Sequence, residues 1–259
     1  MNKELILVMN EKLPINIKEE INDNLRLQIL EETKKAMWSM VEYKELQMMY
    51  SCALKAIQTK FEILNTEFKI KHKRNPISNI TTRLKRNESV IKKLIKYNKP
   101  ISIESIENNL HDFAGIRIVC TYIDDIYMLA DALIKQDDVI LIEAKDYIKN
   151  PKPNGYRSLH LIVEVPIFLS DKKKNVKVEV QIRTIAMDFW ASLEHQMKYK
   201  KDIKENTKIV DQLKQCATVI NQTDEKMLAL RKSIDEAEDI EDEFEVLKEK
   251  LRRIDEPLL

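Results

Sequence analysis

Hydrophobic and polar positions follow different periods along the chain, and the change of period divides it. From residue 33 to about residue 72 apolar residues recur every three or four positions, which predicts a long amphipathic helix. Asn75-Pro76 should end it, because the residue before a proline is disfavoured in the α region. Residues 1–33 are treated as an N-terminal extension, with a helix starting near Ile17. The apolar residues of the helix predicted from residue 33 to about residue 72 form a stripe along one face: Leu46, Met49, Ala53, Ile57, Phe61, Leu64 and Phe68.

Beyond His111 the period shortens to two in several segments, which is typical of strands. Only one clear strand-helix-strand unit is present, so we expect an α+β fold, a mixed β-sheet surrounded by helices. The helix expected at residues 185–199 should turn Ala186, Phe189, Leu193 and Met197 inward. Strands are expected at 115–122, 139–144, 158–169 and 176–184, and helices at 124–136 and 185–199.

The tail carries apolar residues at alternating steps of four and three, which is a heptad pattern. A second helix is expected from about residue 237 to residue 254. A seam of this length needs a partner surface, either the core of the same chain or another subunit, and we favour oligomerisation. The seam is Ile209, Leu213, Cys216, Ile220, Thr223, Met227, Leu230 and Ile234.

Glycine is scarce, with only 2 in 259 residues. Glycine serves where φ is positive or where a ligand approaches the main chain closely. Gly115 should let the loop that carries Asp112 enter its strand, and Gly155 should turn the chain to present Tyr156. The alternative is that both are ordinary turn residues.

The net charge of +1 conceals a strong asymmetry. Residues 69–99 contain eleven Lys or Arg and one acid, about +10, whereas residues 235–256 contain eleven acids and four basic residues, about −7. A concentrated basic segment indicates a polyanionic partner, such as phosphates or a short nucleic acid strand. The alternative is a solvated helix face.

Several classes of protein are excluded or disfavoured by composition. No apolar run is long enough for a membrane span or signal, so a cytoplasmic protein without a membrane role is expected. The three cysteines lie far apart without a zinc or disulfide spacing. Two distant glycines cannot form a glycine-rich phosphate loop, so phosphate recognition should come mainly from side chains. His111-Asp112 suggests a metal phosphohydrolase only weakly, because few further histidines are present.

The strand at 176–184 offers the clearest candidate site. Alternation places four apolar residues on one face and Lys177, Glu179, Gln181 and Arg183 on the other. Asp112 supplies a second carboxylate, and paired carboxylates suit a Mg²⁺ ion that bridges to phosphate oxygens. The alternative for the strand at 176–184 is that its polar face simply lies in water and forms no site. Arg83, Lys85, Lys93 and Arg117 are cations able to hold a polyphosphate, Tyr156 is placed to stack on a base, and Lys152 and His160 lie near it.

Several blocks in this order closely resemble the RelA/SpoT synthetase domain, in the stand-alone form of a small alarmone synthetase of the RelQ type. The blocks are 75–77 (NPI), 82–85 (TRLK), 112–117 (DFAGIR), 154–160 (NGYRSLH), 178–184 (VEVQIRT) and 186–195 (AMDFWASLEH). The resemblance implies transfer of the β,γ-pyrophosphate of ATP to the 3′-hydroxyl of GTP or GDP, with Mg²⁺. It divides the chain into an extension (1–33), a synthetase domain (34–200) and C-terminal helices (201–259) that form a homotetramer.

The resemblance also implies roles for individual residues. Asp112 would bind Mg²⁺, and Glu179 would be the second carboxylate and the general base. The ATP side would comprise Arg83 and Arg117 around adenine, with Lys85 and Lys93 on the phosphates. The GTP side would comprise Tyr156 stacked on guanine, with Lys152, His160, Gln181, Asp188 and Glu194. Asp188 departs from members that carry Asn there, and Glu194 lies about 240° round the helix from it.

Two other functions remain open at this point. The basic segment suits single-stranded RNA, which would make the protein an RNA-binding regulatory module with weak or no synthesis. A related nucleotidyltransferase would release pyrophosphate instead of AMP.

Overall fold

The computed structural model describes residues 15–200 and 207–255, with side chains described for 40–71, 73–197, 208–237, 247 and 248. It divides into a first unit that ends at Met48 and a second that begins at Met49. The helices are α2 (Ile15–His72), α3 (Asn87–Lys96), α4 (Ile103–Asn109), α5 (Ile123–Ile134), α6 (Ile185–Lys200) and α7 (Thr207–Asp255). The strands are β1 (Ile77–Leu84), β2 (Ala114–Cys120), β3 (Ile140–Asp146), β4 (Leu159–Phe168) and β5 (Lys173–Thr184).

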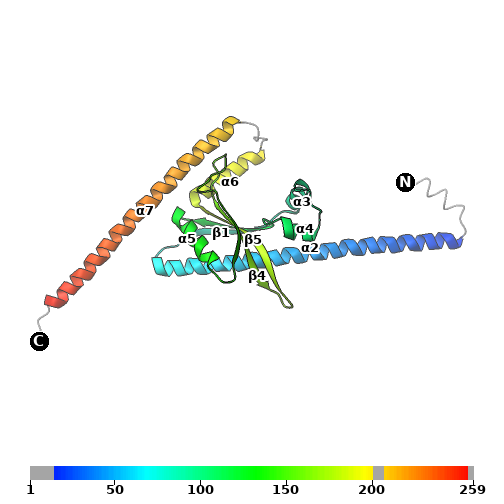
Figure 1. Cartoon of the computed structure of the whole chain (residues 1–259), viewed down its shortest axis with the longest axis horizontal. Helices are drawn as coiled ribbons and strands as arrows, with labels where there is room; N and C mark the ends of the chain where they lie inside the picture. Colours follow the sequence, from blue (N-terminus) through cyan, green and yellow to red (C-terminus); the bar gives the residue numbers. More distant parts are fainter. Residues whose placement is uncertain (1–14, 201–206, 256–259) are drawn as a thin grey trace. The chain divides into compact units, whose positions relative to one another are not determined.

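The second unit is built on a five-stranded sheet of order β1-β2-β5-β4-β3 (Figure 1). β2 and β5 are parallel, and every other neighbouring pair is antiparallel. The sheet is therefore mixed and lies among helices, which confirms the expected α+β class. The parallel pair joins strands far apart in sequence, so their connection contains α5, β3 and β4.

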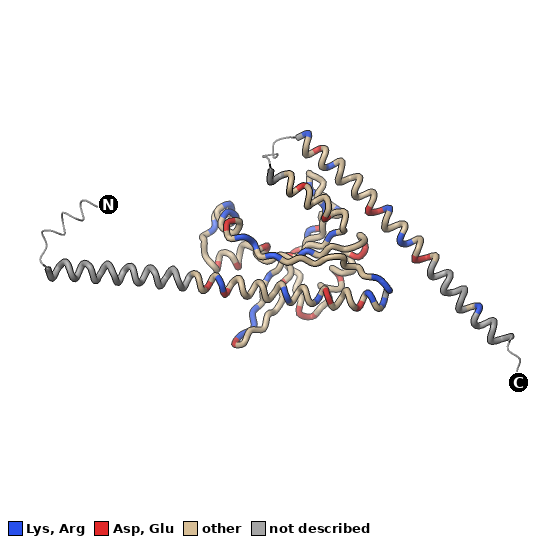
Figure 2. Tube along the Cα trace, turned by 180° about the vertical axis from the view of Figure 1, so that it is seen from behind, with Lys and Arg blue, Asp and Glu red and all other residues tan. Residues whose placement is uncertain are grey.

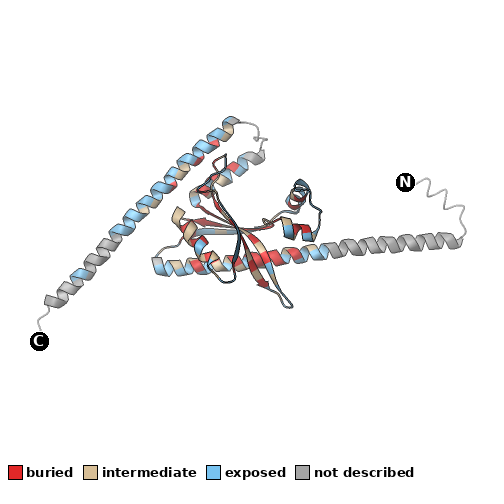
Figure 3. Cartoon of the chain, in the orientation of Figure 1, coloured by how far each residue is buried: buried red, intermediate tan, exposed pale blue. Residues whose placement is uncertain are grey.

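One face of the sheet forms the hydrophobic core, as alternation in β5 predicted. Val178, Val180 and Ile182 are fully buried, as are Ile116 and Ile118 of β2. Figure 3 shows buried residues in the strands of the sheet and in the described part of α2. The α2 stripe is confirmed there, because Met49, Ala53, Ile57, Phe61 and Leu64 are buried. The opposite face of β5 stays polar and is free for chemistry.

The segment between α2 and β2 contains elements that we did not expect. β1 is an edge strand in which only Ile77 is buried, so it lacks the apolar alternation that marks a strand. α3 is short and buries only Val90 and Leu94 among its many lysines. The basic composition of this segment therefore concealed a strand and two helices.

The inward face expected for α6 is wrong. Phe189 is 58% exposed, and the buried residues are instead Met187, Trp190 and Glu194. Trp190 packs on Leu213 and Ala217 of α7, and its indole N–H donates to the Leu213 carbonyl at 3.1 Å. The helix is turned by this contact, which requires α7 and cannot be read from α6 alone.

The tail forms one helix, α7, where two helices were expected. No proline or glycine interrupts residues 207–255, so nothing ends the helix near residue 237. Similarly, α2 passes residue 33 without a break. The division of the chain at residues 33 and 200 stays a prediction. Among the described residues, no helix is long and apolar enough to cross a membrane.

The two glycines differ in what the backbone requires. Gly155 has φ of 91°, and a Cβ there would lie 2.5 Å from the Ala217 Cβ and 3.2 Å from the Lys214 Cα. Gly115 lies outside the left-handed region, and the nearest atom to its added Cβ would be Arg83 Nε at 3.8 Å. The positive φ that favours glycine is therefore found at Gly155 and not at Gly115.

We predict that Gly155→Ala lowers the free energy of unfolding by about 2 kcal/mol or more, because it adds backbone strain to an overpacked contact with α7. Gly115→Ala is the matched control and should change it much less. Urea unfolding of both variants measures the difference. Equal losses would contradict this account.

Candidate active site

The polar face of the sheet carries a cleft of about 670 Å³. Its wall continues along α6, which follows β5 directly. The lining is Arg83, Asp112, Arg117, Lys152, Asn154, Tyr156, His160, Glu179, Gln181, Arg183, Ala191, Ser192, Glu194, His195 and Gln196. Residues that are remote in sequence thus meet in one concave site.

Strand register explains why these side chains meet. Gly115 of β2 pairs with Arg83 on one side and Glu179 on the other. Two residues along, Gln181 of β5 pairs with Arg117 of β2 and His160 of β4. Because residues paired in register point to the same face, four strands present their polar residues together. Gly115 leaves the floor open between Arg83 and Glu179.

Asp112 immediately precedes β2 and is held by two lysines. Lys85 Nζ lies 2.7 Å from Oδ2, and Lys93 Nζ lies 2.8 Å from Oδ1. Burial alone raises the pKa of Asp112, but the hydrogen bonds and charges of both lysines outweigh it and lower that pKa. The Asp112 carboxylate is therefore ionised and forms ion pairs with Lys85 and Lys93.

Glu179, in the middle of β5, accepts from neutral and titratable groups. Gln181 Nε2 donates to its Oε2 at 2.9 Å, and His160 Nδ1 lies 3.3 Å from its Oε1. Burial raises the pKa of Glu179, while the contacts with His160 and Gln181 lower it further than burial raises it. Asp112 lines the same cleft, and its negative charge raises the pKa of Glu179. Glu179 is thus ionised and oriented at neutral pH.

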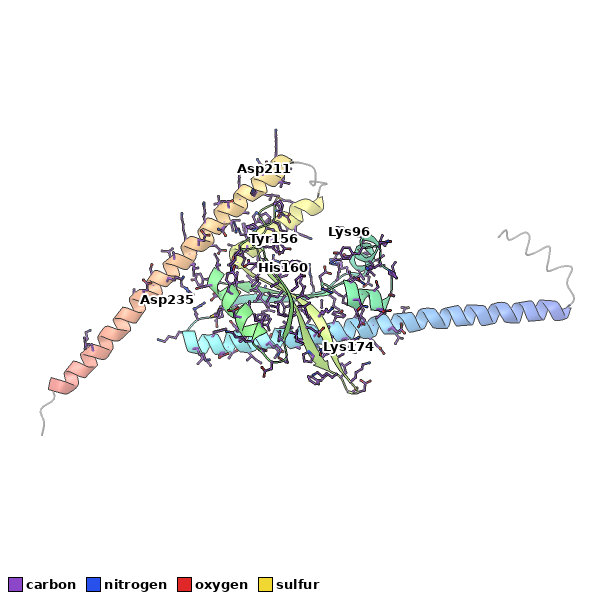
Figure 4. The ribbon with its side chains drawn as sticks, viewed as in Figure 1. Lys96, Tyr156, His160, Lys174, Asp211 and Asp235 are labelled. Carbon is purple, nitrogen blue, oxygen red and sulfur yellow. The ribbon has the colours of Figure 1, made fainter. Side chains whose placement is uncertain are left out.

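The loop between β3 and β4 presents Tyr156. Its stem is closed by the Tyr147 N–H, which donates to the Ser158 carbonyl at 3.0 Å, and its tip by Gly155 N–H to the Lys152 carbonyl at 2.8 Å. The Tyr156 hydroxyl is 2.8 Å from His160 Nε2, and Figure 4 shows these two labelled residues close together. The Gly155 turn therefore sets the position of the Tyr156 ring.

The Tyr156 ring lies among aromatic and cationic neighbours. Lys152 Nζ is 4.8 Å from its centroid and 4.5 Å from that of Tyr147. The Trp190 ring lies 6.5 Å away. Burial raises the pKa of the Tyr156 hydroxyl, which therefore stays protonated. This corner provides a planar, partly enclosed surface of the kind on which a nucleobase stacks.

Asp188, in the first turn of α6, joins two arginines. Its Oδ1 lies 3.2 Å from Arg117 and 3.5 Å from Arg183. A smaller hollow of about 250 Å³ adjoins Arg83 and Arg117 on the β1 side. Glu194 is buried and accepts from Asn154 Nδ2 at 2.9 Å, so it secures the Tyr156 loop.

Every predicted site residue thus lies in this cleft or contacts a residue that lines it. Lys85 and Lys93 contact Asp112, which lines the cleft. Asp188 contacts Arg117 and Arg183, which also line it. Sequence reasoning gave no role to Tyr147 or Asn154, because both lie in a loop, where polar and apolar residues follow no regular period. It placed Arg183 on the correct face of β5 but gave it no role, because nothing in the sequence showed its neighbours.

The carboxylates can be tested for a fit to Mg²⁺. Among the described residues, no group of three or more His, Cys, Asp and Glu side chains could hold a metal ion. Mg²⁺ often needs only one or two protein carboxylates and takes substrate phosphates and water for the rest. Asp112 and Glu179, two carboxylates that line one cleft, fit that requirement, whereas the described residues provide no cage of three or more protein ligands.

Comparison with known proteins gives a consistent picture. The family model described as "Region found in RelA / SpoT proteins" matches residues 82–204. GTP pyrophosphokinase YwaC of Bacillus subtilis is 46% identical over 161 residues, which cover 62% of this chain and 77% of that protein. GTP pyrophosphokinase YjbM of the same organism is 35% identical over 159 residues, 61% of this chain and 74% of that protein.

Solved structures agree in fold. The crystal structure of small alarmone synthetase 2 from Bacillus subtilis has a TM-score of 0.65 and 44% identity, and the match covers 72% of this chain and 97% of that one. Small alarmone synthetase 1 from Bacillus subtilis bound to its product pppGpp has a TM-score of 0.68 and 31% identity, with 74% and 98% covered.

We predict that Asp188→Asn lowers the free energy of unfolding by about 1 to 3 kcal/mol, because it removes a carboxylate beside a buried guanidinium. Asp131→Asn, on an exposed position of α5, is the control and should have little effect. Urea unfolding at pH 7 compares them. Identical midpoints for Asp188→Asn and wild type would refute the importance of this ion pair.

Proposed function

Because this chain belongs to the RelA/SpoT family, and within it to the small alarmone synthetases, we propose that it is a GTP pyrophosphokinase. It transfers the β,γ-pyrophosphate of ATP to the 3′-hydroxyl of GTP or GDP, and it releases AMP with pppGpp or ppGpp. The observation that carries this proposal is the meeting of Asp112 and Glu179 between a cationic side and an aromatic side of one cleft. Such an arrangement suits a reaction between two nucleotides.

ATP is assigned to the side formed by β1 and β2. Arg83 and Arg117 flank the smaller hollow there, and guanidinium planes stack well on a purine base. Lys85 and Lys93 bind the ATP phosphates. Both lysines are paired with Asp112, and the phosphates would offer them a second anionic partner. No glycine loop is needed for this recognition.

The acceptor nucleotide is assigned to the side formed by the Tyr156 loop and α6. Tyr156 stacks on guanine, and Asp188 accepts from the guanine N–H groups. Arg117 and Arg183 both contact the Oδ1 oxygen of the Asp188 carboxylate. Lys152, His160 and Gln181 surround the ribose and phosphates, and Glu194 supports the loop through Asn154.

The proposed reaction begins with the ionised carboxylate of Glu179. It accepts the proton of the 3′-hydroxyl while that oxygen forms a bond to the β-phosphorus of ATP. The bond between the β-phosphorus and the oxygen of the α-phosphate breaks, and AMP leaves with that oxygen. Gln181 and His160 hold Glu179 in position, and the cations offset charge on the moving phosphoryl groups.

Mg²⁺ is the proposed cofactor, held by Asp112 and Glu179 together with phosphate oxygens. When bound, it neutralises phosphate charge and aligns the phosphoryl groups. The support for this assignment is that both carboxylates line one cleft and that their surroundings lower the pKa of each. Both nucleotides are abundant in the cytoplasm, where we place the enzyme.

We predict that wild-type protein with Mg²⁺, labelled ATP and GDP or GTP yields AMP and a guanosine nucleotide that carries the label of the transferred pyrophosphate. Glu179→Gln should reduce turnover by at least about a thousandfold without unfolding the protein, because it removes both a base and a carboxylate ligand. Thin-layer separation of the products measures this, and EDTA should stop the reaction.

The control for that experiment is Glu164→Gln, since Glu164 lies on the same face of the sheet but outside the cleft, bonded to Asn175. Its turnover should stay within about twofold of wild type. Turnover that survives Glu179→Gln would reject the assigned base. Release of pyrophosphate instead of AMP would indicate a nucleotidyltransferase.

A second candidate function is binding of single-stranded RNA. Figure 2 shows Lys and Arg gathered at α3, and Arg86, Lys92, Lys96 and Lys99 there are exposed. These cations are outside the residues assigned to ATP. RNA affinity that falls steeply with salt, together with no AMP release by the wild type, would favour the RNA-binding module.

We propose in addition that the enzyme is a homotetramer formed through α7. The first part of the heptad seam packs within the chain, where Leu213 is buried. Farther along, Met227, Leu230 and Ile234 are 50%, 58% and 58% exposed. A run of apolar residues at this spacing suits a helical partner.

We predict that the double variant Leu230→Glu and Ile234→Glu dissociates the tetramer, because charges would lie in the apolar contact. Sedimentation equilibrium should give four times 30.6 kDa for wild type and a lower mass for the variant. Ala229→Glu, at an exposed position outside the seam, is the control. A wild-type mass of one chain would contradict the tetramer.

A further inference from the structure

Five side chains of the cleft form a closed ring of polar contacts. Arg183 contacts the Tyr156 hydroxyl at 3.0 Å, and that hydroxyl lies 2.8 Å from His160 Nε2. His160 Nδ1 lies 3.3 Å from Glu179 Oε1. Glu179 Oε2 accepts from Gln181 Nε2 at 2.9 Å, and Gln181 Oε1 accepts from Arg183 at 2.6 Å. Four members have a role under the proposed function, and Arg183 has none.

Arg183 is an unusual residue for this position, because its side chain is almost wholly buried. Its residue exposure is 2%, although it stands at the C-terminal end of β5 next to the cleft. A buried charge is costly unless acceptors surround it. The acceptors are the Tyr156 hydroxyl, the Gln181 amide oxygen and Asp188 Oδ1 at 3.5 Å. Each of these three groups belongs to a residue assigned to the binding side of the acceptor nucleotide, GTP or GDP.

A guanidinium can only donate, and this fixes the direction of its bonds to Gln181 and Tyr156 and, through the Gln181 amide, that of the bond to Glu179. Since Gln181 turns its oxygen toward Arg183, its NH₂ group must face Glu179. The Tyr156 oxygen accepts from Arg183 and also contacts His160 Nε2. In the tautomer with its proton on Nδ1, His160 accepts from the Tyr156 hydroxyl and donates to Glu179. Both arms run from Arg183 and end on the ionised carboxylate.

We propose that Arg183 is a positioning residue of the transfer reaction. It acts through Gln181 on Glu179 and through the hydroxyl of Tyr156 on the base-stacking ring. It thereby holds the group that contacts the acceptor base and the group that activates the acceptor hydroxyl in one geometry. This inference rests on the proposed function.

The test is the steady-state kinetics of Arg183→Met, which keeps much of the volume and removes the donors. We expect the KM for GDP to rise about tenfold and kcat to fall about tenfold, the size of a charge-assisted hydrogen bond lost on each arm. The KM for ATP should stay within about twofold. A merely structural role would lower the active fraction, and hence kcat, without separating the two KM values.

Arg231→Met is the matched control. Its guanidinium is also largely buried, with a side chain that is 13% exposed, and it pairs with Asp124 at 2.7 Å away from the cleft. It should leave both KM values unchanged. A KM for GDP that does not change in Arg183→Met, or a parallel rise in both KM values, would overturn the proposal.

A double-mutant cycle keeps the test decisive if Arg183→Met folds poorly. Tyr156→Phe removes the hydroxyl but keeps the ring, and Arg183→Lys keeps the charge. If Arg183 acts through that hydroxyl, the two substitutions together should raise the calorimetric Kd for GDP, without ATP or Mg²⁺, no more than the larger single one. Additive effects would overturn the proposal. Absence of turnover in the wild type would instead reject the proposed function, since GDP binding is read separately.

Discussion

The site depends on the parallel pairing of β2 with β5. That pairing places Gly115 beside Glu179 and Arg117 beside Gln181, so residues that are more than sixty positions apart become neighbours on one face. The antiparallel partners then extend the face, with β1 adding Arg83 and β4 adding His160. The apolar residues that alternate with them form the core. The same hydrophobic burial that stabilises the sheet therefore fixes the positions of the polar groups.

The charges of the site are balanced within the protein itself. Asp112 is neutralised by Lys85 and Lys93, and Asp188 by Arg117 and Arg183. These contacts hold Arg117 and Arg183 in the lining of the cleft and Lys85 and Lys93 beside it, through Asp112. Such preorganisation lowers the cost of orienting donors when the phosphates bind. It also explains how phosphates can be recognised by a chain with almost no glycine.

Much of the fold was predictable where periodicity was strong. The alternation in β5 identified both its buried face and its polar face, and the α2 stripe was confirmed in the second unit. β1 was missed because an exposed edge strand has no apolar alternation. The face of α6 was wrong because Trp190 packs on a helix that lies later in the chain. The resemblance gave site residues that the structure brings together, but no local pattern could show the ring closed by Arg183 or the ion pairs of Asp188.

The central claim is that the cleft holds two nucleotides with their reacting atoms adjacent. A crystal structure with a non-hydrolysable ATP analogue, GDP and Mg²⁺ measures the distance from the GDP 3′-oxygen to the β-phosphorus of the analogue. We expect about 3 to 3.5 Å, with the 3′-oxygen within hydrogen-bond reach of Glu179, as a near-attack geometry requires. Two nucleotides bound with these atoms far apart, or with Glu179 remote from both, would contradict the account.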